Sequence, residues 1–513
     1  MMSSQGWNKK LPQDHGISPR GGAWIPPCRI GTVRLFIAFL FLVLTAAGLR
    51  FFDLAGAPMH ADEAVGARIT ANRLEGVGYR FDPTHHHGPT LSWIAAGVAQ
   101  AVGRKSFEDL DETVLRIVPA ACGTLVVLLP LFLRRWLGDG AVLIAGLLMA
   151  TSPLICQFSR VFIHEPVLVF FSGIALVCMG WWLRGGGVVA AVSGGLALGL
   201  MAATKETFGL TAISWLVALL LCSKSMPRHA WIAAIFSSVA VFLAVVFLAY
   251  GSLGDFFSTY FRYSTDPAHA KPPGYYWYLL VAPKFHTPQW WCEAGVALLA
   301  AAGGWATWKS GNTMTRLLAV STVLQFLLLS LISYKTPWLA VWPWIQACLL
   351  AGTGGAFLLQ PFRSMRFVTG TGLFLLVAFQ IQQTRAAIFR FPNDARNPMA
   401  YSPTSRDVIS LGVRLRALRQ KSPAFCEGII AVLGTGYWPL PWYLKGTAKV
   451  GYFETPPPNI EDFPVVIAMP ESTLEAARYL SGTHEVFYNG LRSEVPVAVF
   501  LRKDVYNEER TAP

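Results

Sequence analysis

Long apolar stretches recur along the first three quarters of the chain and constrain its fold more than any other feature. A helix of about 20 apolar residues spans the hydrocarbon core of a bilayer, and twelve candidate stretches lie between residues 33 and 384. Hydrophobic residues make up 53% of the 513 positions, and only 14% are Asp, Glu, Lys or Arg. Soluble domains carry about 25% charged residues. We therefore expect a polytopic α-helical membrane protein.

The second stretch, 88–103, decides the topology because it is barely long enough to cross and begins beside three histidines. Lys and Arg in short loops mark the cytoplasmic side. One alternate set of short loops holds nine basic residues, and the other holds three, Arg160, Lys205 and Lys335. With the N-terminus inside, the richer set is cytoplasmic only if 88–103 does not cross. We therefore predict eleven transmembrane helices, with the N-terminus inside and the C-terminus outside.

Three regions follow from this topology. Residues 1–32 form a cytoplasmic segment, 33–384 a transmembrane domain with a first outer loop at 53–112, and 385–513 an extracytoplasmic domain. The last region mixes helix-like segments with short apolar runs and predicts a small α/β domain. Its strand-like runs are Gly428–Leu433, Pro464–Ala468 and Val495–Leu501, and its helix-like ones are Asp407–Arg419 and Ser472–Leu480.

The charge and cysteine patterns exclude other classes. The net charge of +13 comes from short basic clusters between apolar runs, not from a continuous stripe that would bind nucleic acid. The eight cysteines show no paired spacing, so neither a disulfide framework nor a CxxC metal site is expected. The chain contains no Asn-x-Ser/Thr sequon. This absence favours a prokaryotic inner (cytoplasmic) membrane over an endoplasmic reticulum.

Two adjacent carboxylates, Asp62 and Glu63, lie about ten residues past the first predicted helix. Acidic groups at a membrane edge are costly unless they are paired or used in function. Asp62 also fits as the N-terminal cap of a helix that starts at Glu63. Capping and catalysis are compatible, so the pattern leaves both open.

Consecutive histidines, His85, His86 and His87, follow in the same loop. Neighbouring side chains diverge, so at most two of them would share one metal ion. A solvated run with no ligand role is the more common case. For His87 we favour contact with a phosphate group.

The second outer loop holds a better metal and phosphate candidate. Pro166 fits the first turn of the next helix, which places His164 and Glu165 at the N-terminus of that helix. These two residues are the candidate metal ligands, and Arg160 is a candidate phosphate contact. The alternative is an interfacial ion pair between Arg160 and Glu165.

Lys205 and Lys335 occupy two further outer loops, so five separate clusters on four outer loops deliver charged or metal-capable side chains to one face. Each has a structural explanation by itself, but their convergence predicts a functional site. Polar residues gathered at one edge also favour an enzyme over a transporter. A transporter would be expected to have charged residues in mid-membrane and two repeated halves.

These segments together resemble the GT-C superfamily of polyprenyl-phosphate-sugar-dependent membrane glycosyltransferases, which includes protein O-mannosyltransferases and aminoarabinose transferases. The Asp62-Glu63 pair, Leu115–Ala120 and the stretch from Arg160 to Glu165 carry this resemblance. A closer similarity, to the archaeal and bacterial flippase activity-associated branch, covers about residues 30–450. Its segments are His60–Ala64, Tyr79–Pro89, Lys205–Thr207, Ser333–Trp338, Asn397–Tyr401 and Trp438–Leu444.

The resemblance implies an inverting transferase that acts on the outer face, with Asp62 as the catalytic acidic residue and Glu63 as its partner. The expected partners are a polyprenyl-phosphate sugar donor, membrane lipid and an acceptor protein, lipid or glycan. Positive charge at the departing phosphate would come from Arg116, Arg160, Lys205, Lys335 and His87. Arg116 could instead snorkel to the lipid head groups.

A divalent ion, Mn²⁺, Mg²⁺ or Zn²⁺, held by Glu165 and His164 would clamp the donor phosphate. This His-Glu pair departs from the acidic residues that are more common there in the superfamily, which leaves the metal open. The alternative function is a flippase or transporter for polyprenyl-linked glycans, or an accessory protein without transferase activity.

Overall fold

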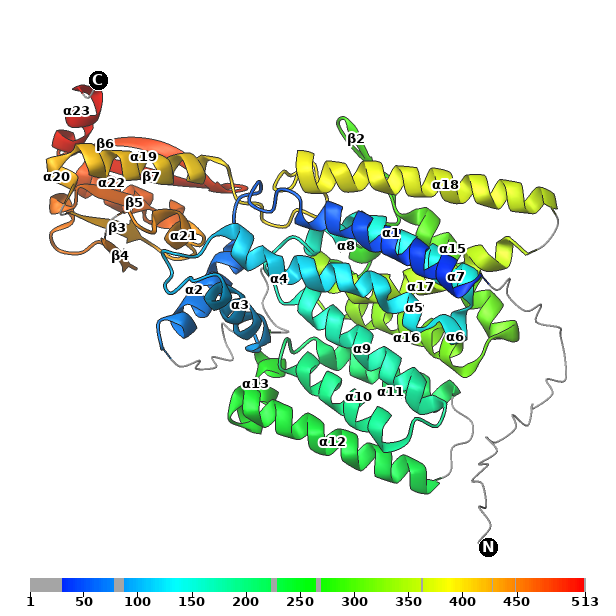
Figure 1. The fold of residues 1–513 in the computed structure, drawn as a ribbon. Coiled ribbons are helices and arrows are strands. Elements are labelled where there is room, and N and C mark those ends of the chain that lie inside the picture. The colour runs from blue at the N-terminus through cyan, green and yellow to red at the C-terminus, as the bar shows by residue number, and fades with distance from the viewer. Residues whose placement is uncertain are drawn as a thin grey trace, which may run out of the picture.

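The computed structural model describes residues 30–77, 87–222, 228–263, 269–360, 363–426, 428–447 and 449–511. These residues form a bundle of long helices and an α/β domain that lies at one end of the bundle (Figure 1). His85, His86 and nearly all of the predicted segment 1–32 lie outside the described residues.

Six helical segments of the described chain are long and apolar enough to cross a membrane. They are α1 (Thr32–Phe51), α4 (Glu112–Leu125) with its continuation to Phe132, α9 (Glu165–Leu183), α16 (Thr313–Leu331), Pro337–Leu358 with α17 (Val341–Leu358), and Arg366–Arg390, which contains most of α18 (Arg363–Arg385). Shorter apolar helical stretches lie among them: α7 (Asp139–Thr151), α10 (Gly187–Ala202), α11 (Phe208–Cys222) and the part Ile235–Tyr250 of α12 (Arg228–Tyr250). With α15 (Ala294–Ser310), every stretch predicted to cross contains a helix. The polytopic helical fold is confirmed.

The exposure of these helices indicates which of them face lipid. Only 17% of the apolar window of α1 is buried, whereas 83% of the window that contains α17 is buried. Large apolar side chains of α1 and α18, such as Phe41 and Phe374, stay more than two thirds exposed, at 74% and 71%. Exposed apolar surface of this extent is unfavourable in water. The centre of the bundle is therefore α17, and α1 and α18 lie at its lipid-facing edge.

Small residues bring the central helices into backbone contact. A Cβ added at Gly303 of α15 would lie 2.0 Å from the carbonyl oxygen of Leu350 in α17. A Cβ at Gly354 of α17 would lie 2.0 Å from the carbonyl oxygen of Leu299. Close approach at small residues is a typical way for helices to associate in membranes.

The first outer loop folds as two short helices, α2 (Ala61–Leu74) and α3 (Thr90–Ala101), at the end of the bundle that carries the α/β domain. Helix α3 is the segment whose crossing decided the predicted topology. Its 12 residues extend about 18 Å at about 1.5 Å per residue. That length is too short for a hydrocarbon core of about 30 Å.

The α/β domain contains a five-stranded sheet with the strand order β4-β3-β5-β7-β6. Strand β3 pairs in parallel with β4 and β5, and β7 pairs antiparallel with β5 and β6. The bounds are β3 (Ile429–Leu433), β4 (Lys449–Phe453), β5 (Val465–Ala468), β6 (His484–Arg492) and β7 (Val495–Arg502). Helices α19 (Asp407–Lys421), α20 (Pro423–Cys426), α21 (Leu440–Leu444), α22 (Thr473–Leu480) and α23 (Lys503–Thr511) complete it.

The expected small α/β domain is thus confirmed, with β3, β5 and β7 at the predicted apolar runs. Strands β4 and β6 were not predicted, because they lie at the two edges of the sheet and their side chains are largely exposed or half-buried.

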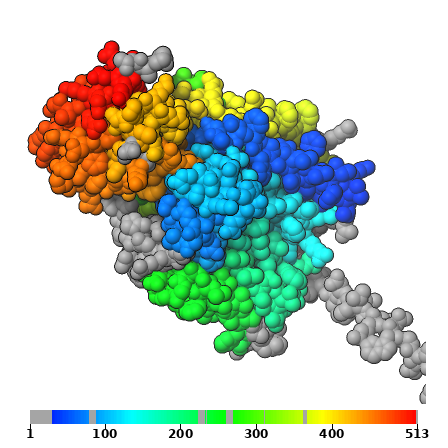
Figure 2. All heavy atoms as spheres, turned by 60° about the vertical axis from the view of Figure 1, so that its left-hand side comes forward, coloured from blue at the N-terminus to red at the C-terminus, as the bar shows by residue number. Residues whose placement is uncertain are grey.

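The α/β domain and the first loop are fastened together at Met59. The Met59 amide donates to the Tyr443 hydroxyl at 2.7 Å, and Thr404 Oγ1 donates to the Met59 carbonyl at 2.8 Å. Trp442 Nε1 donates to Glu112 Oε1 at 2.8 Å. Apolar side chains of α2, α3 and α4 also share one buried cluster with those of the domain. Figure 2 shows the first-loop helices, in blue, against the orange surface of the domain.

Candidate active site

A cavity of about 310 Å³ lies at this end of the bundle, between the first loop and the α/β domain. Loops that are far apart in the sequence supply its walls. The sequence likewise predicts that side chains from separate outer loops meet at one face. Its ionisable side chains, tyrosines apart, are His60, Asp62, His87, His164, Glu165, Lys205, His269 and Arg492.

The start of α2 separates the two predicted carboxylates. The cap is His60, not Asp62: His60 Nδ1 accepts from the Asp62 amide at 3.1 Å, and Glu63 Oε2 accepts from the His60 amide at 2.8 Å. Successive helical residues point about 100° apart. Asp62 therefore lines the cavity with its side chain 57% exposed, 3.9 Å from His60 Nδ1, whereas Glu63 turns into the core.

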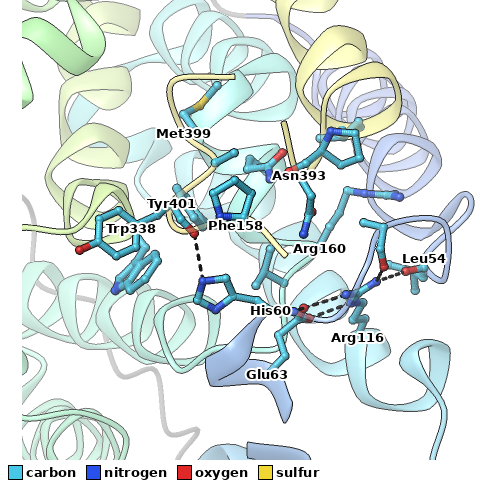
Figure 3. Close-up of a pocket in the computed structure, with 17 residues that line it drawn as sticks. Leu54, His60, Glu63, Arg116, Phe158, Arg160, Trp338, Asn393, Met399 and Tyr401 are labelled. Atoms are coloured by element: carbon cyan, nitrogen blue, oxygen red, sulfur yellow. Dashed lines mark hydrogen bonds and ion pairs between the residues drawn. The ribbon is translucent and has the colours of Figure 1, made fainter. Parts of the chain in front are cut away.

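Glu63 and Arg116 form a buried ion pair that lines a separate, smaller pocket, the one drawn in Figure 3. Arg116 Nε and Nη2 each donate to the Glu63 carboxylate at 2.7 Å. The guanidinium also donates to the carbonyls of Leu54, Ala57 and Pro58. Burial acts to raise the pKa of Glu63, but the charge and hydrogen bonds of Arg116 and two backbone amides hold it below its usual range. Both side chains are fully engaged, and neither lines the cavity.

Arg160 caps the end of α1. Nη1 donates to the carbonyls of Leu49, Arg50 and Phe52, and Nη2 donates to the carbonyl of Asp53 at 2.7 Å. A helix leaves its last carbonyls without partners, and Arg160 satisfies them. The ion pair of Arg160 with Glu165 that the spacing left open is not formed.

Glu165 pairs with Lys205 instead. The Lys205 ammonium lies 2.5 Å from Glu165 Oε1, and both residues are buried. Burial acts to lower the pKa of Lys205, but Glu165 and Glu206 together raise it above its usual value. Glu165 Oε2 is buried and makes no hydrogen bond within the described chain. The pair borders the cavity with a charged amine and one unused carboxylate oxygen.

His87 pairs with Glu206, which follows Lys205 in the chain. His87 Nδ1 and Glu206 Oε2 lie 2.9 Å apart. Burial acts to raise the pKa of Glu206, but His87 and Lys205 lower it to about 2. His164 packs edge-on against His87, with ring centroids 4.9 Å apart. The structure thus brings His87, His164, Glu165 and Lys205 together.

Lys335 lies near the cavity but does not line it. Its backbone amide donates to the His269 carbonyl at 3.0 Å, beside a bridge between Ala270 and Tyr334. Its ammonium donates to the carbonyls of Ile332 and Lys271. Lys335 therefore fastens one loop to the end of α16.

Two cavity residues, His269 and Arg492, were missed by sequence reasoning. His269 hydrogen-bonds the hydroxyl of Tyr401, which belongs to the Asn397–Tyr401 segment of the resemblance. Arg492 ends strand β6 in the α/β domain. No motif marks either position, and only the folded contacts bring them to Asp62.

The comparisons with known proteins agree with this architecture. Residues 86–251 match the family described as dolichyl-phosphate-mannose-protein mannosyltransferase, and no curated protein sequence matches the chain. ArnT from Cupriavidus metallidurans in the apo state is 15% identical, with a TM-score of 0.64 over 91% of this chain and 98% of ArnT. The Archaeoglobus fulgidus oligosaccharyltransferase tethered with an acceptor peptide is 13% identical, with a TM-score of 0.55 over 89% of this chain and 73% of that one. This chain has the GT-C fold.

Some proteins with the GT-C fold bind metal: the Archaeoglobus fulgidus oligosaccharyltransferase has been solved in complex with Zn and sulfate, at 13% identity and a TM-score of 0.51 over 88% of this chain and 71% of that one. In the part of this chain that the structure describes, no three His, Cys, Asp or Glu side chains gather closely enough to hold a metal ion. The predicted ligand Glu165 already accepts from the Lys205 ammonium. A divalent ion beside that ammonium would be repelled, so these residues do not fit a resident metal.

Proposed function

We propose that this chain is an inverting glycosyltransferase that moves a sugar from a polyprenyl-phosphate donor to an acceptor. The observation that carries the proposal is the exposed Asp62 carboxylate in a cavity of about 310 Å³, beside the Lys205 ammonium. ArnT with the same fold has been solved bound to undecaprenyl phosphate, at a TM-score of 0.59 and 14% identity. The family matched by residues 86–251 is named for a dolichyl-phosphate sugar.

Asp62 acts as the general base in this proposal. An acceptor hydroxyl or amine in the cavity gives its proton to Asp62 as its oxygen or nitrogen attacks the anomeric carbon. The bond between that carbon and the phosphate oxygen breaks, and the polyprenyl phosphate leaves on the opposite face. His60 caps α2 and holds Asp62 at the cavity wall.

Lys205 stabilises the leaving phosphate. Its ammonium carries three N–H donors and uses one on Glu165, so the others are able to serve phosphate oxygens. Charge-assisted hydrogen bonds of this kind are strong. His87 and His164 shape the same wall.

Arg116, Arg160, Lys335 and Glu63 act as positioning residues in this proposal. Each is committed to protein partners: Glu63 and Arg116 to one another, Arg160 to the end of α1 and Lys335 to carbonyls. They fix the start of α2, which presents Asp62, the end of α1 and the loop at Lys271. No step of the proposed reaction passes through a metal ion.

The site faces the outside of a cytoplasmic membrane in this proposal. Its support is the distribution of Lys and Arg, which are rare in the short loops on the cavity side and frequent in those on the other side. The acceptor is then a protein, lipid or glycan of the cell envelope, and the sugar reaches it without crossing the bilayer.

The test is turnover of labelled polyprenyl-phosphate sugars by the purified full chain in lipid nanodiscs. Asp62→Asn should reduce turnover by at least about a hundredfold, the scale of general base catalysis. The matched control is Glu108→Gln, an exposed acid of the first loop outside the cavity. Full turnover in Asp62→Asn would overturn the proposed base. Movement of the intact lipid across the bilayer, unaffected by Asp62→Asn, would favour a flippase.

A further inference from the structure

Arg492 brings a cation from the α/β domain into the cavity. Its Nη2 donates to the Gly436 carbonyl at 2.7 Å, whereas its Nε is buried and has no hydrogen-bond partner within the described chain. A buried guanidinium N–H without a partner is unfavourable. A ligand that accepts from this group would remove that cost.

Two other basic groups of the cavity already lie against carboxylates. Lys205 shares its charge with Glu165, and His87 lies against Glu206. Among the described residues that line the cavity, Arg492 is the Lys or Arg side chain that forms no salt bridge with a carboxylate. The negative charge that acts on it is Asp62. A phosphodiester that enters the cavity is negative, as is Asp62, and the Lys205–Glu165 pair has no net charge. The phosphodiester therefore needs a further positive group.

We propose that Arg492 binds the donor phosphate together with Lys205, so that the α/β domain forms one wall of the donor site. This inference rests on the proposed function and adds a specific anion contact to it. The guanidinium presents its N–H groups in a fixed fork that matches two phosphate oxygens, which an ammonium cannot do.

The surroundings of Arg492 hold it in place for this role. The carbonyl that accepts from Nη2 belongs to Gly436, whose φ of +66° is a conformation that side-chain-bearing residues rarely adopt. The Met59 contacts with Thr404 and Tyr443 fix the domain against the first loop that carries Asp62. These contacts hold the guanidinium at the cavity wall, where a small shift of the side chain would turn its N–H groups toward a bound phosphate.

The test measures binding of undecaprenyl phosphate and of uncharged undecaprenol to the full chain in nanodiscs. The wild type should prefer the phosphate, and Arg492→Gln should lose at least about tenfold of that preference, the effect of one charge-assisted hydrogen bond. Arg492→Lys should recover part of it. Undecaprenol affinity should stay unchanged in every variant, because it lacks the group that Arg492 contacts.

Arg478→Gln is the matched control, since Arg478 is an exposed arginine on α22 of the same domain and lies outside the cavity. A wild type with no preference for the phosphate would overturn the proposed donor itself. A preference that Lys205→Gln loses and Arg492→Gln keeps would overturn the role of Arg492 alone. Equal loss of undecaprenol binding in Arg492→Gln would show damage to the fold and would also refute a specific phosphate contact.

Discussion

Replacing Arg116 with Met separates a structural cation from a ligand of the donor phosphate. Met keeps an unbranched apolar chain but removes both 2.7 Å bonds to Glu63 and the bonds to three carbonyls. Removing one partner of a buried ion pair leaves an unpaired charge and costs about 3–5 kcal/mol. We expect that loss in the free energy of unfolding, because both side chains are almost fully buried, at 2% and 1% exposed.

Buried thiols give the readout. Cys122 lies on the same helix as Arg116, and Cys156 and Cys348 lie deeper in the bundle, all three buried. A thiol-reactive dye labels them only as the protein opens, so heating in nanodiscs reports an unfolding midpoint. Cys28, the exposed Cys426 and the half-buried Cys222 and Cys292 are first replaced by Ser, so that labelling reports the buried thiols. Arg116→Met should lower the midpoint strongly.

Two further variants sharpen the result. Combining Glu63→Gln with Arg116→Met should recover part of the loss, because no charged carboxylate then stays buried without a partner. Arg104→Met is the matched control: its salt bridge to Asp111 is 41% and 39% exposed, and such pairs contribute about 1 kcal/mol or less. An unchanged midpoint in Arg116→Met, with weakened binding of undecaprenyl phosphate, would refute the structural role.

Three other outcomes follow from the structure. Glu206 has a folded pKa of about 2 against 4.5 ordinarily, so its stabilising contribution, roughly 3 kcal/mol at neutral pH, is lost as pH falls from 4.5 toward 2; Glu206→Gln should flatten acid unfolding in that window, and an unchanged profile would contradict this. Gly303→Ala should destabilise the bundle by about 1–3 kcal/mol, measured by Cys348 labelling, while Gly304→Ala, with open space at its Cβ, should not; equal effects would argue against the backbone contact. Chelator should leave turnover unchanged, because Lys205 already occupies Glu165; activity lost to chelator and restored by one divalent ion would contradict this.

Apolar length predicted the helices well, because it is a property of the sequence alone. Partner choice is different. Arg160 contacts carbonyls of residues 49–53, more than 100 positions earlier, and no spacing within its own loop indicates them. The short distance from Arg160 to Glu165 suggested an ion pair instead. The loop between α10 and α11 supplied the cation that Glu165 uses.

Partners from distant loops also explain why Asp62 and the glutamates around it have different proposed roles. Glu63, Glu165 and Glu206 each lie against a basic side chain, Arg116, Lys205 and His87 respectively. A carboxylate that contacts a permanent cation is a weaker proton acceptor, because protonation would sacrifice the ion pair. Asp62 lies 3.9 Å from His60 Nδ1 and keeps 57% of its side chain exposed. Because Asp62 and Glu63 point about 100° apart on α2, Asp62 faces the cavity and is able to accept a proton there. The paired acids around it keep the loops and the cations of the donor site in place.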